Sequence, residues 1–339
     1  MATFSIVDIK ITKNTKLSLK FIFLFFLTVF IGLRHEVGGD WDIYLYDFYN
    51  NVEHFDILKL DYVRDFGYEL ISYFSFKLNI GIYGLNFILA TIFVFAINKF
   101  SLELKNNYWL IILISFPYLI VIVAMGYTRQ AAAFSFVLLS ICNINERKLI
   151  LFLLNSLLAI LFHKSSAIML PIIFISFFRF NLKNLFIFSL LFITSMLIIY
   201  PEIDRISSGY LNQFSQYKSS GVVYRISLNI LAGLIFVIFY KKLKFDSSFN
   251  KLLIIVFFIN CFLFFLIDNY STFVDRIIIY FTFIQLVVFS RLYLILPKYK
   301  IIINILVIIM YGFVFNIWMN LSFHSYAWIP YKNILLINL

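Results

Sequence analysis

The sequence carries little charge for its length. Asp, Glu, Lys and Arg make up 13% of its 339 residues, about half the share found in soluble domains. No stretch is polar enough to form a separate soluble domain, and 63% of the residues are hydrophobic. Backbone polar groups in lipid must be paired within the chain, which favours helices. The sequence therefore predicts one all-α transmembrane domain over residues 1–339.

Cysteines and the motifs of soluble enzymes are also scarce. The two cysteines, Cys142 and Cys261, both lie in apolar runs, so neither a disulfide framework nor zinc-type spacing is present. The sequence contains no Gly-rich nucleotide loop, no Ser-centred nucleophile motif and no HExxH. No small-residue cleavage site follows the first apolar run. The net charge of +11 does not indicate nucleic-acid binding, because the basic residues stand singly or in short clusters between apolar runs.

Eleven apolar runs approach the roughly 20 residues that a helix needs to cross a bilayer. We expect transmembrane helices at residues 17–33, 82–98, 108–125, 128–144, 149–162, 165–178, 184–200, 225–240, 252–267, 276–295 and 301–318. The fifth and sixth of these are short and separated by a polar stretch, so they could instead form a re-entrant pair. Residues 66–80 are apolar but contain Glu69 and Lys77, which predicts an interfacial helix.

Basic residues are distributed unevenly between the expected loops. With a cytoplasmic N-terminus, the cytoplasmic segments contain 17 of the 28 Lys and Arg residues but 4 of the 17 Asp and Glu residues. This asymmetry follows the positive-inside rule, and eleven crossings then place the C-terminus on the periplasmic side. The expected outer segments are residues 34–80, 201–224 and 319–339. Within the first of them, we expect the acidic run from Asp56 to Asp65 to be a solvated face.

Four polar features stand at predicted outer helix ends. They are Arg34-His35-Glu36-Val37-Gly38-Gly39-Asp40-Trp41, Gly126-Tyr127-Thr128-Arg129-Gln130, Phe162-His163-Lys164-Ser165-Ser166-Ala167, and Asp275-Arg276 with Tyr280. Each one alone could be topological, because arginines at helix ends often snorkel to headgroups. Basic residues on the outer side nevertheless oppose the positive-inside rule, and a charge inside the membrane costs about 2.5–3.5 kcal/mol. Guanidinium groups bind phosphate oxygens bidentately, so these arginines, with Arg225, predict a site for a lipid-linked pyrophosphate.

The ordered set of motifs resembles the EpsG-like proteins, which belong with Wzy-type O-antigen polymerases. GLRHEVGGDWDIY is similar to the R-x-x-x-G-x-D-x-x-x-Y signature of that family, and Arg129-Gln130 with the following alanines is similar to its R-Q-x-x-A element. Phe162–Ala167 resembles the F-H-x-S-A/S element, and Trp328-Ile329-Pro330-Tyr331 resembles a further family feature. The resemblance spans residues 20 to 335 or so. It departs at Phe66–Glu69, where the family often has a Glu-Pro-Gly-Phe-like stretch.

The resemblance implies a metal-independent, GT-C-like glycosyltransferase in the bacterial inner (cytoplasmic) membrane. Such an enzyme joins undecaprenyl-pyrophosphate-linked oligosaccharide repeat units into O-antigen or a related surface polysaccharide at the periplasmic face. Donor and acceptor lipids, membrane lipid and a chain-length regulator are the implied partners; no cofactor and no nucleic acid are expected.

The expected site residues fall into two groups. Arg129 and Arg276 would stabilise the leaving pyrophosphate, and Asp40 or His163 would act as the base. Further substrate contacts are expected from Arg34, Gln130, Lys164, Arg225, Asp275, Tyr280 and Tyr331. No metal-binding residues are expected.

Three alternative functions remain open from the sequence. An O-antigen ligase would use the same donor with a different acceptor, although ligases usually carry one large periplasmic loop. A lipid-linked oligosaccharide flippase or another transporter would need polar residues near the membrane midplane and often shows two related halves. The predicted mid-span positions are mostly apolar; the exceptions are Asn155, Asn229, Asn260 and Gln285. A membrane scaffold without catalysis is the third alternative.

Overall fold

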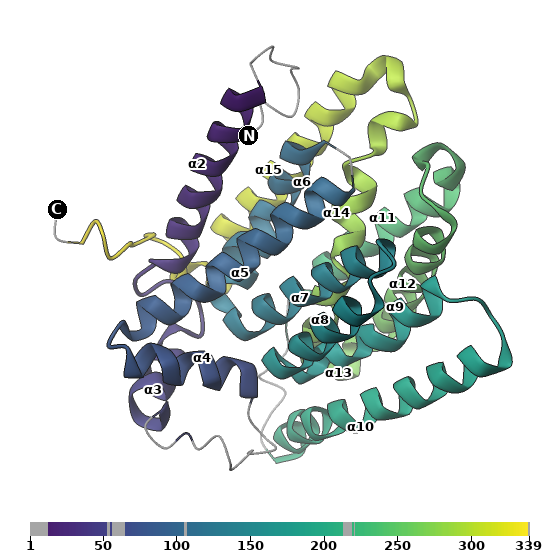
Figure 1. The fold of residues 1–339 in the computed structure, drawn as a ribbon. Coiled ribbons are helices and arrows are strands. Elements are labelled where there is room, and N and C mark those ends of the chain that lie inside the picture. Colours follow the sequence, from purple (N-terminus) through teal and green to yellow (C-terminus); the bar gives the residue numbers. More distant parts are fainter. Residues whose placement is uncertain are drawn as a thin grey trace. The chain divides into compact units, whose positions relative to one another are not determined.

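The described part of the chain is helical. The computed structural model describes residues 13–52, 55, 65–104, 107–212, 219 and 221–337 (Figure 1). These residues form no β-strand, and their one isolated antiparallel bridge joins Arg34 to Asn333. His54, most of the acidic run and residues 213–218 of the second expected outer segment lie outside the described residues. The predicted all-α class is confirmed.

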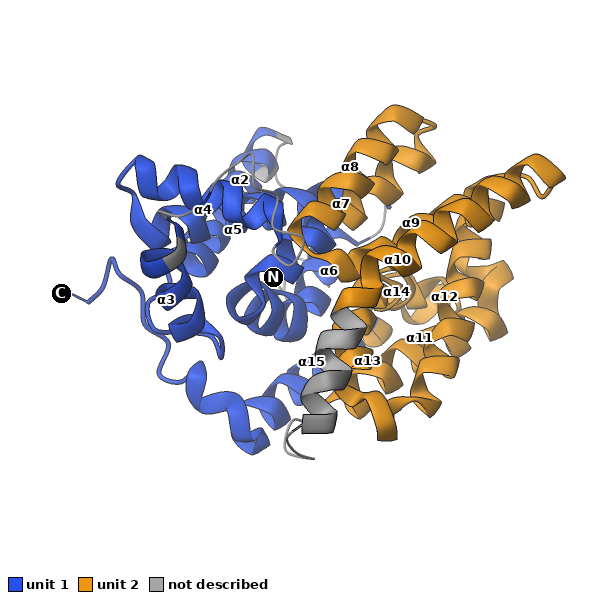
Figure 2. Cartoon of the chain, turned by 90° about the horizontal axis from the view of Figure 1, so that it is seen from below, with its two compact units in different colours: residues 1–135, 304–339 blue, residues 136–303 orange. Residues whose placement is uncertain are grey.

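The chain divides into two compact units, which we describe one at a time. Unit 1 comprises residues 1–135 and 304–339, and unit 2 comprises residues 136–303 (Figure 2). The boundaries fall within helix α7, Thr128–Asn145, and helix α15, Lys300–Leu321.

Unit 1 is built mainly from α-helices. Besides parts of α7 and α15, unit 1 contains α2 (Lys13–Gly32), α3 (Trp41–Asn51), α4 (Phe66–Lys77), α5 (Gly81–Glu103), α6 (Tyr108–Ser115), the π-helix η2 (Phe116–Ala124) and the 3₁₀-helix η6 (Phe323–Ala327). Helix α2 packs along α5, and α4 packs against α5. The predicted helix at residues 66–80 is confirmed as α4, whereas the sequence pattern does not predict α3.

Unit 2 contains the remaining helices, long and short. They are α8 (Leu149–Phe162), η3 (Lys164–Ile168), α9 (Met169–Phe177), α10 (Leu182–Asn212), α11 (Val222–Leu243), α12 (Ser247–Phe265), α13 (Ile267–Phe281), α14 (Phe283–Phe289), η4 (Leu292–Leu294) and η5 (Pro297–Tyr299). Helix α11 packs against α12, α13 and α14, and η3 contacts α8, α9, α10 and α13. These contacts bring the turn after α8 close to α13.

Local sequence signals explain several helix ends. Asp246 caps α12, because its carboxylate accepts a hydrogen bond of 2.7 Å from the backbone N–H of Phe249. The Asn107 side chain accepts from the N–H of Leu110 at the start of α6 in the same way. Helix α11 ends at Lys244, whose left-handed conformation (φ 54°) stops the helix. Polar residues that flank the apolar runs therefore set where the helices begin and end.

Each of the eleven predicted transmembrane segments overlaps one to three consecutive helical segments. Within the described chain, five helices are long and apolar enough to cross a membrane, and the bent pair α13–α14 would make six. The five are Gly81–Glu103, Leu182–Pro201, Val222–Leu243, Ser247–Phe265 and Pro297–Leu321. The apolar parts of α2, α6–η2, α8 and η3–α9 are shorter, at 10–17 residues. Eleven crossings, and the sides on which the termini lie, stay predictions.

The long apolar helices are incompletely covered by protein. In the most apolar windows of α10 and of the span containing α15, 11% and 17% of the residues are buried. Leu182 and Phe186 of α10 and Phe313 of α15 are among the exposed large side chains. Exposed apolar surface on this scale belongs in lipid rather than water. The protein is therefore a helical membrane protein.

Candidate functional site

Arg34 follows α2 and is 1% exposed. Its Nη1 donates to the carbonyl of Ile31 at 2.9 Å, its Nε donates to the carbonyl of Val37 at 3.1 Å, and its Nη2 donates to the side-chain oxygen of Asn86 at 3.3 Å. Burial lowers the pKa of Arg34 to about 10, which leaves the side chain protonated at neutral pH. This arrangement commits the guanidinium to holding the loop together rather than to an external anion.

The loop after Arg34 leads directly into helix α3. Gly38 has a φ of +114°, a conformation that side-chain-bearing residues rarely adopt, and a Cβ at this position would lie 2.4 Å from the carbonyl oxygen of Met125. Asp40 precedes the first residue of α3; it is partly exposed, and its carbonyl accepts from the N–H of Tyr44 at 3.0 Å. The loop geometry therefore places the Asp40 carboxyl group at the start of α3.

Arg129 lies in the first turn of α7, beside two tyrosines from α3 and α4. Its guanidinium carbon is 5.3 Å from the ring centroid of Tyr44 and 5.6 Å from that of Tyr68. Its Nη1 lies 3.4 Å from a carboxylate oxygen of Asp65, and the Arg129 side chain is 31% exposed. An arginine framed by aromatic rings that keeps part of its surface open is suited to binding an anionic oxygen. Gln130, the next residue, is buried.

The position of Asp65 corrects one expectation. The acidic run was expected to be a solvated face, but Asp65 is 6% exposed and forms the ion pair with Arg129. A buried carboxylate needs such a partner, because desolvation is costly for an unpaired charge. The two tyrosines beside Arg129 are desolvated as well: Tyr44 is buried, and burial raises the pKa of the Tyr68 hydroxyl. The sequence contains one signal for the position of Asp65: it directly precedes an apolar helix start, where aspartate is favoured.

The C-terminal segment closes the end of helix α2. The hydroxyl of Tyr331 donates to the carbonyl of Phe30 at 2.8 Å, and the amide of Asn333 donates to the carbonyl of Val29 at 3.3 Å. The backbone N–H of Ile334 donates to the carbonyl of Leu33 at 3.0 Å. The last carbonyls of a helix have no partner within the helix. The segment supplies a donor to one of them, that of Phe30, and adds donors to Val29, whose carbonyl also accepts from the Leu33 N–H, and to Leu33, which directly follows α2. Tyr331, expected to contact substrate, is in the structure a cap of α2.

His163, Ser165 and Tyr280 meet in unit 2. The Ser165 hydroxyl lies 2.7 Å from Nδ1 of His163 and 3.1 Å from the Tyr280 hydroxyl. The backbone N–H of Ser165 also donates to Nδ1 of His163 at 3.4 Å, which caps η3. All three side chains are buried. The structure thus joins the predicted turn after α8 to the predicted tyrosine of α13.

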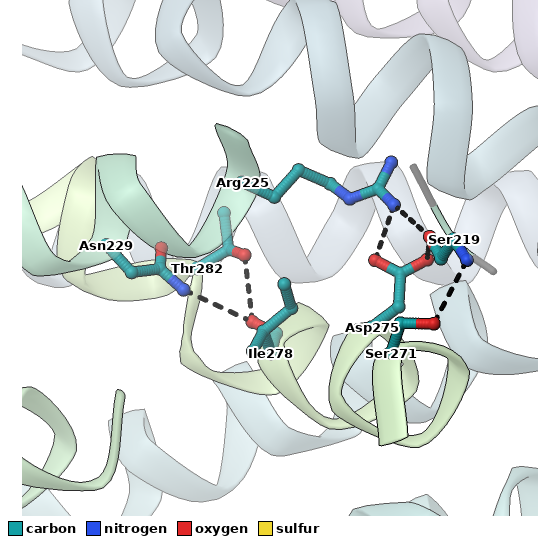
Figure 3. A network of polar contacts seen from close by, with 7 residues as sticks. All are labelled: Ser219, Arg225, Asn229, Ser271, Asp275, Ile278 and Thr282. Carbon is teal, nitrogen blue, oxygen red and sulfur yellow. Dashed lines mark hydrogen bonds and ion pairs between the residues drawn. The ribbon is translucent and has the colours of Figure 1, made fainter. Parts of the chain in front are cut away.

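Arg225 and Asp275 form an ion pair in unit 2 (Figure 3). The distance between Nη2 of Arg225 and a carboxylate oxygen of Asp275 is 2.6 Å. The Ser219 hydroxyl donates to the other carboxylate oxygen at 2.9 Å and accepts from Arg225 at 2.9 Å, while its backbone N–H donates to the Ser271 hydroxyl at 3.2 Å. The Arg225 guanidinium is therefore paired with the Asp275 carboxylate, whereas the Arg129 guanidinium is partly exposed. The predicted residues Arg276 and Lys164 are partly exposed.

The four sequence features come together in two pairs. In unit 1 the Gly38–Asp40 loop lies against the turn before α7, and in unit 2 the turn after α8 lies against α13. Sequence analysis missed several residues that hold these clusters. They are Asp65, Tyr68, Asn86, Ser165 as a bridge, Ser219, Ser271 and Asn333. No group of three or more metal-ligating side chains occurs among the residues that the structure describes.

Comparison with known proteins gives one match. The family model described as the EpsG family matches residues 17–333 of this chain, nearly its whole length. Searches among curated proteins and among solved structures give no match. A family match of this extent indicates a role of the polysaccharide polymerase type.

Proposed function

Because the chain belongs to the EpsG family, we propose that it polymerises undecaprenyl-pyrophosphate-linked oligosaccharide repeat units into O-antigen or a related surface polysaccharide. The reaction takes place at the periplasmic face of the bacterial inner membrane. One observation carries the proposal at the level of the site: Arg129 is a partly exposed guanidinium in an otherwise buried cluster of two tyrosines and Asp65.

The reaction is a glycosyl transfer. An acceptor hydroxyl oxygen forms a bond to the anomeric carbon of the donor, and the bond from that carbon to the pyrophosphate oxygen breaks. The electron pair of the broken bond leaves with undecaprenyl pyrophosphate, and the hydroxyl proton passes to a base. The transition state has oxocarbenium character, as in glycoside hydrolysis. Charge therefore builds on the diphosphate, where a positioned arginine stabilises it.

Arg129 fits this role better than Arg34 or Arg225. The 3.4 Å separation between Arg129 and Asp65 is long for a charge-assisted hydrogen bond, so a diphosphate oxygen can compete for the guanidinium. Arg34 is engaged by two carbonyls, and Arg225 is engaged by Asp275 at 2.6 Å. We assign the main diphosphate contact to Arg129 and a supporting contact to Gln130; the contacts expected from Arg276 and Lys164 stay predictions.

The geometry favours Asp40 over His163 as the base. Nδ1 of His163 accepts from the Ser165 backbone N–H, so the neutral ring carries its proton on Nε2, where it can donate but not accept. Asp40 is a partly exposed carboxylate at the start of α3. We assign proton acceptance to Asp40; a role for His163, which Ser165 and Tyr280 orient, stays a prediction.

Complementation of a deletion strain tests the proposal. Arg129→Ala should remove long-chain polymer from a lipopolysaccharide ladder gel, leave single repeat units on the core and leave the amount of protein in the membrane unchanged. Arg129→Lys should retain a fraction of the polymer, because lysine keeps the charge but not the bidentate fork. Arg179→Ala, which removes an exposed arginine from a predicted cytoplasmic loop, is the matched control.

The outcomes separate the alternatives. A normal chain-length distribution in the Arg129→Ala strain contradicts the assignment of Arg129. A deletion strain with no repeat units on the core indicates an O-antigen ligase. A deletion strain that retains its lipid-linked donor on the cytoplasmic leaflet, where periplasmic enzymes cannot reach it, indicates a flippase.

A further inference from the structure

Trp328 is a buried residue whose indole reaches into unit 1 from the C-terminal segment. Its Nε1 donates to the carbonyl of Val121 in η2 at 2.8 Å. The Trp318 ring contacts its edge, with ring centroids 5.1 Å apart and an interplanar angle of 83°. A tryptophan that is held by a hydrogen bond and a ring contact has little freedom to move.

The indole packs against two glycines, Gly39 and Gly126, whose backbones also lie close to each other. A Cβ added to Gly126 would lie 2.7 Å from Cζ2 of Trp328, closer than packed side chains come, and one added to Gly39 would lie 3.6 Å from Cη2. Both distances are to the six-membered part of the indole ring. Gly39 directly precedes Asp40, and Gly126 lies three residues before Arg129. The same ring therefore touches both segments that carry the proposed base and the proposed diphosphate contact.

The backbone on either side of Trp328 is fixed to the same loop. The N–H of Gly38 donates to the carbonyl of Ala327 at 2.8 Å, and the N–H of His35 donates to the carbonyl of Lys332 at 3.0 Å. These bonds flank position 328 and so hold the backbone that carries the indole against the loop. A large rigid side chain that packs against both backbones restrains how they can shift relative to each other.

We propose that Trp328 is a positioning residue that fixes the spacing between the loop carrying Asp40 and the helix start carrying Arg129. The proposal rests on the function proposed above, since the spacing matters only if both residues act on the substrate. A displacement of about 1 Å between reacting groups can cost on the order of a hundredfold in rate. Trp328 acts through Asp40 and Arg129 and does not itself contact the substrate.

A suppressor experiment tests the contact between Trp328 and Gly126. Gly126→Ala should reduce long-chain polymer at least tenfold, because its Cβ collides with the indole. Trp328→Phe alone should reduce polymer two- to fivefold, through loss of the hydrogen bond to Val121. The double variant Gly126→Ala/Trp328→Phe should recover at least to the level of Trp328→Phe, since phenylalanine lacks the outer ring carbons. Gly312→Ala is the matched control, because nothing lies within 4 Å of a Cβ there.

Two results would overturn the proposal. One is a Gly126→Ala variant with normal polymer; the other is a double variant that makes less polymer than either single variant. The amount of each variant protein in the membrane is measured, so that a decrease in polymer caused by less protein is not attributed to a changed spacing.

Hydrogen exchange in lipid nanodiscs provides a readout that does not depend on activity. In Trp328→Ala, the amides of Gly38 and Tyr127 should exchange at least tenfold faster than in the unchanged protein. In Trp109→Ala, which removes a partly exposed tryptophan elsewhere in unit 1, both amides should exchange at their usual rates. Unchanged exchange at both amides in Trp328→Ala refutes the positioning role. A normal ladder from the deletion strain refutes the proposed function instead, whatever the exchange result.

Discussion

Arg34 shows how a motif arginine can serve the fold. Its side chain donates to the carbonyls of Ile31 and Val37 and to Asn86 while almost fully buried. One of these carbonyls belongs to the last turn of α2, where the helix offers no partner of its own. A buried carbonyl that loses its donor costs about 1–3 kcal/mol. The arginine of the GLRHEVGGD motif therefore stabilises the loop that presents Asp40.

Replacement of Arg34 should destabilise unit 1. In Arg34→Met two buried carbonyls lose their donors, and we expect a loss of about 3 kcal/mol in the free energy of unfolding. Arg34→Lys should lose nearly as much, because one ammonium cannot reproduce the fork of the guanidinium. Thermal unfolding in nanodiscs measures both, with the exposed Lys77→Met as control. An unchanged unfolding temperature for Arg34→Met would show that these hydrogen bonds do not stabilise the loop.

The Glu36–Lys332 pair should make the C-terminal segment sensitive to pH. The Lys332 ammonium, at 2.5 Å, lowers the pKa of Glu36 by hydrogen bonding and by its charge. Because the folded-state pKa lies below the ordinary value of about 4.3, the pair stabilises the fold above that pH, and this contribution is lost as the pH falls through the lowered pKa. The effect is small, since both groups are exposed.

Hydrogen exchange at the Ile334 amide, which donates to Leu33, reports on this pair. After correction for the intrinsic pH dependence, exchange should become faster as the pH drops from 5 to about 3. Glu36→Gln lacks the charge at every pH and should show no such acceleration. The same pH profile in both proteins would mean that the pair does not hold the C-terminal segment.

At the scale of elements, the apolar runs were enough to locate most helices. Each of the eleven predicted runs overlaps helical structure, because a long apolar segment has no other way to pair its backbone in lipid. Helix α3 was missed because Tyr and Asp interrupt its apolar residues. The partners of Arg129 and the docking of Trp328 could not be predicted, since both depend on contacts between residues far apart in the sequence. Spacing along the chain carries no information about such contacts.

The bend between α13 and α14 is a second feature that no local signal predicts. The two helices meet at 44°. The Thr282 N–H donates to the carbonyl of Ile279, so the carbonyl of Ile278 takes the Thr282 hydroxyl at 3.0 Å and the Asn229 amide at 3.5 Å instead (Figure 3). Asn229 also donates to Asn260 at 3.0 Å and accepts from Gln285 at 2.7 Å. A buried amide network therefore supports the bend that follows Asp275 and Tyr280 in the chain.

Single and combined substitutions should show how much the amide network contributes to the stability of unit 2. Asn229→Leu should destabilise unit 2 by about 1 kcal/mol, because it removes hydrogen bonds between helices and leaves polar partners buried. The triple variant Asn229→Leu/Asn260→Leu/Gln285→Leu should recover much of that loss, since no member of the amide network is then left without its partner. Thermal unfolding measures the stability of each variant. A triple variant whose loss equals the sum of the three single losses would contradict this account.

For the whole molecule, the number of crossings is the open question that the charges address. The apolar runs and the charge pattern together predict eleven, whereas length and composition single out five or six spans in the described chain. The two counts differ in how many of the helices before α10 cross the membrane. With eleven crossings, six of them precede Leu182, so that Asn14 and Leu182 share the cytoplasmic side. If only the long helices cross, α5 alone precedes Leu182, and these two residues lie on opposite sides.

Cysteine accessibility distinguishes the two counts. Single cysteines at Asn14, Leu182 and Phe323, all exposed, would be placed in a Cys142→Ser/Cys261→Ser background. A membrane-impermeant maleimide applied to spheroplasts should label position 323 and should reach positions 14 and 182 only after permeabilisation. Labelling of 14 and 182 from opposite sides would reduce the number of crossings.

Position 323 also reports on the side of the membrane where the proposed chemistry takes place. Helix η6, which contains it, leads directly into Trp328, and Trp328 packs against Gly39 and Gly126. Its accessibility therefore gives the side on which Asp40 and Arg129 lie. If position 323 is labelled only from the cytoplasmic side, Arg129 faces a compartment where the positive-inside rule already accounts for an arginine. The electrostatic reason for assigning it to a periplasmic diphosphate would then be lost.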